Sequence, residues 1–223
     1  MGAWDAASRF TFDLQGYIHI PGALSESDLA ALTELVEGEI DRRAPSQPQD
    51  NAYTELCHHA VSWGGPCLSL VDHPAVAPAL ASILGPGYRL DHDYAIRMRW
   101  DGSAVGTTRH TSQLHGGVGA VHVTVVWELS DVGEGEGGFA CVAGSHNLSR
   151  RHQYPWPRRP PWPEESGVRT VPCRAGDALI FTEEMTHATA PYKGKHGRTT
   201  LFLKSDPRPS KLAPIHLLVT FRG

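Results

Sequence analysis

The hydrophobic pattern of the chain has helical spacing in its first third and strand-like alternation in the rest. Apolar residues after Ser25 recur every three or four positions, as in an amphipathic helix: Leu29, Leu32, Leu35, Val36 and Ile40. Ser25, with Asp28 three positions later, resembles a capping box, so we expect this helix to begin near Ser25. A second, shorter helix is expected from Pro74 to Leu84, where Gly85-Pro86 would end it.

From residue 88 onward the pattern is that of β-strands. Residues 90–100 alternate apolar with charged side chains, which predicts a strand with one buried face. Residues 12–20 alternate more loosely and end at the turn Pro21-Gly22. Further strands are predicted at Ala120–Leu129, Gly138–Val142, Val168–Cys173, Asp177–Thr182, Arg198–Lys204 and His216–Phe221. Helices followed by many short strands indicate an α+β, mainly β fold, with a sandwich or barrel flanked by N-terminal helices.

Composition narrows the classes of protein that remain. The 223 residues suit a single domain spanning 1–223, and the net charge of -4 without a basic tract argues against binding to polymeric nucleic acid or a membrane surface. No apolar run is long enough to span a bilayer, and the N-terminus does not resemble a secretory signal. The four cysteines are irregularly spaced, which indicates reduced thiols in a cytoplasmic protein.

Three short motifs carry the candidate chemistry. The first is Gln113-Leu114-His115-Gly116-Gly117, just before a predicted strand. The second is the run from Gly137 to His146, GGFACVAGSH, and the third is Gly176-Asp177-Ala178-Leu179-Ile180-Phe181 followed by His187 and Arg198. Because the chain has 13 histidines, a single one is weak evidence, and the order and spacing of the three motifs are what matter.

Together these motifs resemble the phytanoyl-CoA dioxygenase family of iron(II)/2-oxoglutarate enzymes. The resemblance implies a double-stranded β-helix, or jelly-roll, core with Fe(II) near its mouth, bound by His115 and His187. It also implies that Arg198 pairs with the distal carboxylate of 2-oxoglutarate, a bidentate task that suits a guanidinium. Thr189 is expected to assist Arg198, and Trp127 to pack on the cosubstrate.

The sequence departs from the family pattern at one ligand. Where the family has an aspartate two residues after the first histidine, this chain has Gly117, whose missing side chain cannot reach a metal. Iron/2-oxoglutarate halogenases resemble this variant of the motif, so the leading interpretation is a halogenase in which chloride binds iron beside Gly117 and O2 is the oxidant. The first alternative is a hydroxylase with water or another carboxylate at the site, Glu128 and Asp131 being candidates. The second alternative is a non-catalytic binding protein.

The substrate is expected to be a soluble small molecule. The layout resembles freestanding nucleotide halogenases of purine antibiotic pathways, which implies the deoxyribose of dAMP as the group chlorinated. A phosphate would need cationic donors, for which Arg109, His110, Arg150 and Arg151 are candidates, although solvated surface would explain them equally. The proline- and tryptophan-rich segment from Tyr154 to Glu165 is interpreted as a lid or rim loop.

Other histidines are weighed against ordinary structural roles. His146 follows a Gly-Ser turn, and we expect it to be structural. His122 stands on the strand after the first motif and could face the metal, which would give a three-histidine site.

The missing carboxylate generates a direct test by substitution. Gly117→Asp restores the family's usual ligand and should abolish chlorination while permitting some hydroxylation, because an aspartate would fill the place of the chloride. Product analysis by mass spectrometry would measure this, and equal chlorination by wild type and variant would contradict the halogenase interpretation.

Overall fold

The computed structural model describes residues 4–46, 54–99, 122–148, 167–190 and 192–207. The helices are α1 (Ala6–Gln15), α2 (Glu26–Arg43), α3 (Gly65–Leu68) and α4 (Ala77–Leu84), with short 3-10 turns η1 (Ala44–Ser46), η2 (Ala60–Trp63) and η3 (Ser145–Asn147). The strands are β1 (Tyr17–Ile20), β2 (Thr54–His58), β3 (Arg89–Met98), β4 (Val123–Glu128), β5 (Gly138–Val142), β6 (Val168–Thr170), β7 (Ala178–Thr182), β8 (His187–Ala190) and β9 (Arg198–Asp206).

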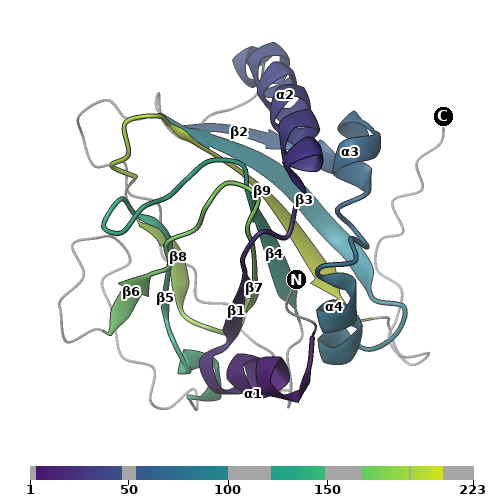
Figure 1. The fold of residues 1–223 in the computed structure, drawn as a ribbon, viewed down its shortest axis with the longest axis vertical. Coiled ribbons are helices and arrows are strands. Elements are labelled where there is room, and N and C mark those ends of the chain that lie inside the picture. The colour runs from purple at the N-terminus through teal and green to yellow at the C-terminus, as the bar shows by residue number, and fades with distance from the viewer. Residues whose placement is uncertain (1–3, 47–53, 100–121, 149–166, 191, 208–223) are drawn as a thin grey trace.

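The strands form two antiparallel sheets that pack against each other. The major sheet has the order β1-β7-β4-β9-β3-β2, and the minor sheet has the order β6-β5-β8. Figure 1 shows α2, α3 and α4 on one side of the major sheet and the minor sheet on the other. The predicted α+β, mainly β fold with a jelly-roll core and flanking N-terminal helices is therefore confirmed.

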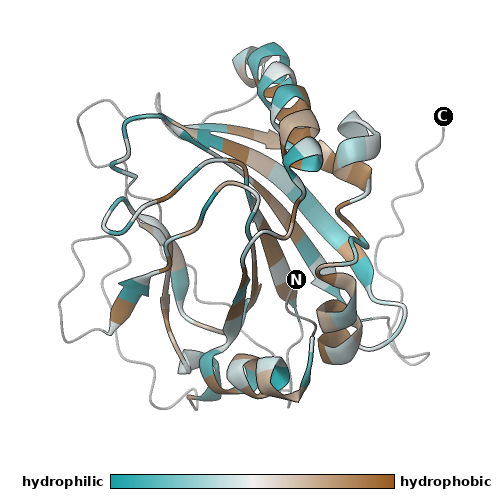
Figure 2. Ribbon diagram, viewed as in Figure 1, coloured by the Kyte–Doolittle hydropathy of each residue, from teal (hydrophilic) through white to brown (hydrophobic). Residues whose placement is uncertain are grey.

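The major sheet is buried on both faces. Successive side chains of a strand point to opposite sides, so each strand contributes to two buried regions. One face of β4 places Val123, Val125 and Trp127 in a core shared with α2 and α4. The other face places Val126 with Phe139 of the minor sheet, in the space between the sheets. Figure 2 shows α4 as largely hydrophobic and α2 as banded with hydrophilic residues.

The helices confirm one prediction and correct another. α2 begins where the capping box indicates, because the Ser25 hydroxyl accepts the Asp28 N–H at 3.1 Å. The loose alternation from residue 12 was wrong as a strand signal before Tyr17, since α1 occupies Ala6–Gln15. Asp5 caps this helix, and Gly16, with a φ of 84°, ends it in the left-handed region that favours glycine.

The remaining predictions concern strands, a lid and cysteines. The strand predicted at His216–Phe221 and the proposed lid at Tyr154–Glu165 lie outside the described residues. Strands β2 and β8 were not predicted, whereas the predicted strand from Val168 stops at Thr170 apart from an isolated bridge between Cys173 and Val132. All four cysteines are free, as expected for reduced thiols. In the described ranges, none of the helices combines the length and apolarity needed to cross a bilayer.

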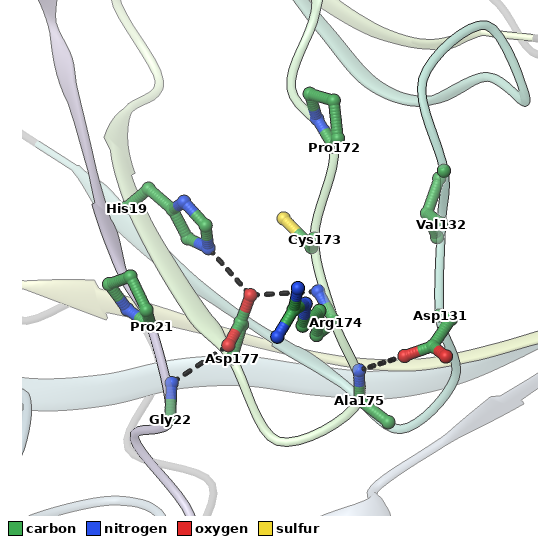
Figure 3. Close-up of a pocket in the computed structure, with 11 residues that line it drawn as sticks. His19, Pro21, Gly22, Asp131, Val132, Pro172, Cys173, Arg174, Ala175 and Asp177 are labelled. Carbon is green, nitrogen blue, oxygen red and sulfur yellow. Dashed lines mark hydrogen bonds and ion pairs between the residues drawn. The ribbon is translucent and has the colours of Figure 1, made fainter.

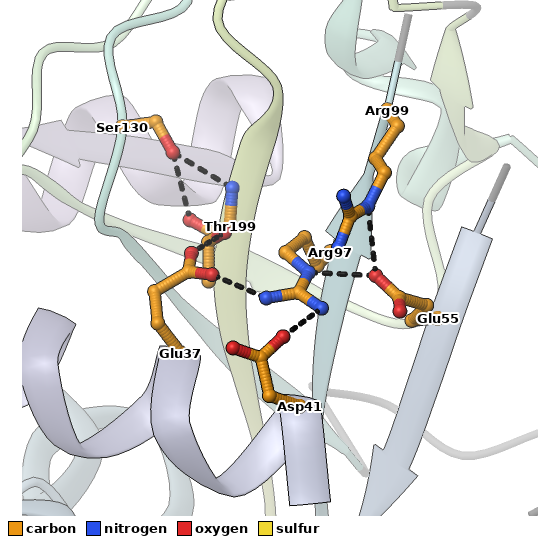
Figure 4. Close-up of polar contacts among 7 residues, drawn as sticks. All are labelled: Glu37, Asp41, Glu55, Arg97, Arg99, Ser130 and Thr199. Atoms are coloured by element: carbon orange, nitrogen blue, oxygen red, sulfur yellow. Dashed lines mark hydrogen bonds and ion pairs between the residues drawn. The ribbon is translucent and has the colours of Figure 1, made fainter. Parts of the chain in front are cut away.

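A buried arginine joins α2 to the sheet. The Arg97 guanidinium, on the helix-facing side of β3, donates to Glu55 of β2 and to Glu37 and Asp41 of α2, at 2.6–2.7 Å (Figure 4). Glu37 also accepts a hydrogen bond from the Thr199 hydroxyl of β9. The hydrogen bond from Arg97 holds the pKa of the Glu55 carboxyl below its usual range. One side chain therefore links three elements that are far apart in sequence.

We expect Arg97→Met to lower the free energy of unfolding by about 2–3 kcal/mol at neutral pH, because charge-assisted hydrogen bonds are lost. The depressed pKa of Glu55 means that this stabilisation is present above the unfolded-state pKa and is lost as pH falls through the folded-state pKa. Urea unfolding across the acid range should therefore show a flatter pH dependence in the variant. Arg99→Met, which removes an exposed contact to Glu55, is the control and should change stability by less than about 0.5 kcal/mol.

Candidate active site between the two sheets

The space between the sheets holds two of the predicted site residues, His187 and Arg198. His187 begins β8 of the minor sheet, and Arg198 begins β9 of the major sheet; both are buried. Their elements are separated by a turn, so the fold brings both residues to the interior. The other predicted residues, of the first motif and of the substrate site, lie outside the described residues: His115, Gly117, Arg109, His110, Arg150 and Arg151.

His187 is oriented for metal binding by its neighbours. Its Nδ1 lies 2.9 Å from the Met185 carbonyl oxygen, which can only accept, so Nδ1 carries a proton and a metal bound to this ring would bind through Nε2. The ring packs on Phe181, with centroids 4.6 Å apart, and lies parallel to Phe139 at 6.5 Å. The aromatic contacts and the backbone hydrogen bond together fix the imidazole plane. This is the orientation and the restraint that an Fe(II) ligand requires.

Strand alternation separates the two other expected cofactor residues. Thr189 stands two positions after His187 and on the same side of β8, opposite Phe139 in the ladder. Trp127 lies on the other face of the major sheet, in the helix-side core, with its ring 5.1 Å from that of His73. The structure therefore does not bring Trp127 together with His187 and Arg198.

Arg198 forms a buried ion pair with Glu128. Its Nε donates to Glu128 Oε2 at 3.1 Å and its Nη2 donates to Oε1, so one edge of the guanidinium meets the carboxylate in a fork. The Thr200 hydroxyl also donates to Glu128, at 2.8 Å. Both charged side chains are almost wholly buried, and each would be costly without the other.

The remaining edge of Arg198 suits a second carboxylate. Its Nη1 lies 3.9 Å from the Met98 sulfur, which is a weak acceptor. A carboxylate oxygen in place of that sulfur would make a stronger, charge-assisted bond. Because Arg198 and Met98 are both almost wholly buried, the Met98 side chain would have to move for a carboxylate to reach this edge.

A carboxylate that the sequence analysis missed lies beside His187. Glu183, in the turn between β7 and β8, has Oε2 at 3.9 Å from His187 Nε2. Its Oε1 accepts a hydrogen bond of 2.5 Å from the Thr124 hydroxyl, and Lys204 Nζ lies 3.8 Å from Oε2. The signal in the sequence was an acidic residue four positions before a predicted ligand, in the turn that joins β7 to β8.

The carboxylates suggested from sequence are engaged elsewhere. Glu128 is held by Arg198 and Thr200, and Asp131 accepts the Ala175 N–H at 2.8 Å on an exposed turn.

The two other histidines considered from the sequence lie in other contacts. His122 has Nε2 at 3.5 Å from Asp206, at the far end of β9 from Arg198. His146 contacts the Asp13 carbonyl at 3.0 Å and packs where a Cβ on Gly16 would stand, which confirms its structural role.

A pocket of about 650 Å³, lined in part by Val132, Cys173 and Asp177, contains a second group of potential metal ligands. His19, Cys173 and Asp177 lie close together there (Figure 3). However, Asp177 already accepts hydrogen bonds from the backbone N–H groups of Gly22 and Arg174, at 2.8 and 2.7 Å, and contacts His19 Nε2 at 2.8 Å.

The Cys173 thiol in this pocket is buried and donates to the Val171 carbonyl oxygen at 3.6 Å. Burial raises the pKa of Cys173 to about 12, and a thiol must lose its proton to bind a metal. We therefore interpret the group as a structural clasp between β1 and the turn before β7. Although the pocket is large, it contains neither His187 nor Arg198.

Comparison with known proteins agrees with this geometry. The model of the family described as phytanoyl-CoA dioxygenase (PhyH) matches residues 12–200. No curated protein matches the chain in sequence.

Solved structures share the fold at low sequence identity. HygX from Streptomyces hygroscopicus, with nickel and 2-oxoglutarate bound, is 18% identical with a TM-score of 0.70, covering 92% of this chain and 88% of HygX. The carbocyclase SnoK from nogalamycin biosynthesis is 19% identical with a TM-score of 0.71, covering 92% and 85%. The epimerase SnoN, in complex with Fe3+, alpha ketoglutarate and nogalamycin RO, is 20% identical with a TM-score of 0.69, covering 91% and 85%.

The Arg198–Glu128 pair yields a prediction about stability and ligand binding. We expect Glu128→Gln to lower the free energy of unfolding by about 3 kcal/mol, because the guanidinium stays buried without its counter-charge. Added 2-oxoglutarate should then raise the melting temperature of the variant more than that of wild type, since its distal carboxylate replaces the lost anion. Glu134→Gln, at an exposed position, is the matched control. Equal ligand-induced shifts in all three proteins would contradict the assignment of Arg198.

Proposed function

Because the chain belongs to the phytanoyl-CoA dioxygenase family of non-haem iron and 2-oxoglutarate-dependent oxidoreductases, we propose that it hydroxylates an unactivated C–H bond of a small molecule. The observation that carries this proposal is the buried imidazole of His187, whose Nδ1–H is committed to the Met185 carbonyl and whose Nε2 is turned toward a carboxylate. This orientation leaves Nε2 as the ring nitrogen through which His187 would bind a metal.

The proposal assigns a role to each residue of the site. His187 and, from the sequence motif, His115 hold Fe(II), and Arg198 holds the distal carboxylate of 2-oxoglutarate with support from Thr189. Bound iron, 2-oxoglutarate and O2 would supply the oxidising power to remove a hydrogen atom from carbon. Val126, Phe181 and Phe202 line the interior with apolar surface, which excludes water from the reacting carbon.

Chlorination is the second candidate, and a specific observation favours it. Gly117 leaves the usual position of the metal-binding aspartate without a side chain, and a chloride needs that room. Hydroxylation ranks first because Glu183 places a protein carboxylate beside His187. The two reactions share every other part of the site, so one assay separates them.

The substrate class follows from the site and from similar proteins. A nucleotide such as dAMP remains the first substrate to test, with Arg109, His110, Arg150 and Arg151 as phosphate donors. HygX and SnoN, which have the same fold, have been solved with hygromycin B and nogalamycin RO. These two structures support adding hygromycin B and nogalamycin RO to the substrate panel.

The proposal is tested with purified protein loaded anaerobically with Fe(II) and 2-oxoglutarate, then exposed to O2 with each substrate, with and without chloride. We expect succinate and a product that has gained one oxygen atom, in equal yield with and without chloride. A product in which chlorine replaces hydrogen would establish the second candidate instead. Succinate formation and products would be followed by mass spectrometry.

Substitution of the metal ligand gives the matched comparison. His187→Ala should lower substrate-dependent succinate formation by about 100-fold or more, because the metal loses a ligand. His58→Ala, at an exposed position, should leave it unchanged. Equal activity of the two variants would contradict an iron site at His187.

A further inference from the structure

We propose that Glu183 is the carboxylate ligand of the iron, in place of the aspartate that position 117 lacks. The inference rests on the proposed iron site at His187 and deepens it by naming a residue outside the family's His-x-Asp pattern. It starts from the approach of Glu183 Oε2 to within 3.9 Å of His187 Nε2.

The separation of the two atoms suits a shared metal ion better than a direct contact. At 3.9 Å they are too far apart for a hydrogen bond. Two ligand atoms that each lie about 2.1 Å from a metal, at angles between octahedral and tetrahedral, are about 3.0–3.4 Å apart. A small rotation of the Glu183 side chain would close this difference, so both atoms can reach one ion.

The surroundings of Glu183 hold its carboxylate in this position. The Thr124 hydroxyl of β4 donates to Oε1, which leaves Oε2 on the side of His187. The Glu183 backbone N–H donates to the His122 carbonyl at 3.1 Å, which ties the turn after β7 to the start of β4. Lys204 Nζ, on β9, lies 3.8 Å from Oε2. A carboxylate held in a fixed orientation beside an imidazole is a suitable ligand for Fe(II).

The charge in this part of the interior also needs an explanation. Side chains of Glu183 and His187 are only 17% and 9% exposed, and burial of charged groups is unfavourable unless they are paired or bind a metal. The Met185 carbonyl accepts from Nδ1 of His187, so Nε2 is the ring nitrogen that faces Glu183 and would bind the metal. A metal ion held between Nε2 and Oε2 would join these two largely buried side chains.

The assignment has a chemical consequence for the reaction. A carboxylate from the turn after β7 would occupy a coordination position and balance one charge of Fe(II), as the family's aspartate does. Chloride would then have neither an open position nor a charge deficit to fill. With glycine at position 117, the carboxylate ligand would come from Glu183 instead, and the reaction would still transfer oxygen.

The test measures metal binding itself, with Co(II) as the probe and the full-length protein under anaerobic conditions. We expect Glu183→Gln to weaken Co(II) binding at least about tenfold, because a ligand and a negative charge are both lost. Glu184→Gln is the matched control, since its neighbouring carboxylate is hydrogen-bonded to the Thr182 hydroxyl and should leave the affinity unchanged. Glu183→Asp, which keeps the charge on a shorter side chain, should lie between Gln and wild type.

A spectroscopic measurement separates a ligand from a nearby charge. Chloride should leave the visible spectrum of Co(II) unchanged in wild type and shift it in Glu183→Gln, where a coordination position has opened. A saturable chloride shift in wild type, or equal Co(II) affinity of the Glu183→Gln and Glu184→Gln variants, would overturn the assignment while leaving the proposed function intact. Failure of wild type to bind Co(II), or equal binding by His187→Ala, would instead overturn the proposed function.

Discussion

The alternation of side chains across the major sheet is the constraint on which the rest of the structure depends. Each strand must satisfy two buried environments at once, an apolar core beneath the helices and a partly polar space facing the minor sheet. On β4, Val125 and Trp127 lie in the core beneath the helices, while Thr124 and Glu128 face the minor sheet. A shift of one residue in register would exchange the two sets and remove both the core and the site.

Two pairs of opposite charges lie between the sheets in the part of the chain that the structure describes. Glu128 and Arg198 form one pair, and Glu183 and Lys204 form another. In the ladder between β4 and β9, Thr124 lies opposite Lys204 and Glu128 opposite Thr200, with Val126 and Phe202 between them. The interior wall therefore has two polar ends separated by an apolar section. A dicarboxylate would be bound by polar groups such as those at the ends, and a hydrocarbon by an apolar surface such as the middle section.

The sequence predicted most of the elements because their signals are local. The capping residues around Ser25 and the spacing of Leu32, Val36 and Ile40 are sufficient to define α2, whose inward face is buried as expected. The helix from Ala6 was missed because Phe10, Phe12 and Leu14 alternate with polar residues as in a strand, and its ends depend on the single residues Asp5 and Gly16. His187 and Arg198 were found through their spacing within a motif, and both proved to be interior.

What could not be predicted depends on long-range geometry. Nothing in the sequence around Glu128 indicates that it would pair with Arg198, 70 residues away, because the partner is set by the ladder between β4 and β9. The placement of Trp127 failed to match expectation for the same reason, since a single residue of register decides which face a side chain occupies. Glu183 required knowledge of how the turn after β7 closes back on His187.

The clasp at Asp177 sets a limit on how the chain can be shortened or rearranged. Its carboxylate receives the backbone of Gly22 and the side chain of His19 from one segment and the backbone of Arg174 from another, more than 150 residues later. Deleting the first 22 residues would therefore strip a buried anion of most of its partners and expose the edge of β7. New termini or tags are better introduced ahead of α1, where the chain has not yet joined the sheet.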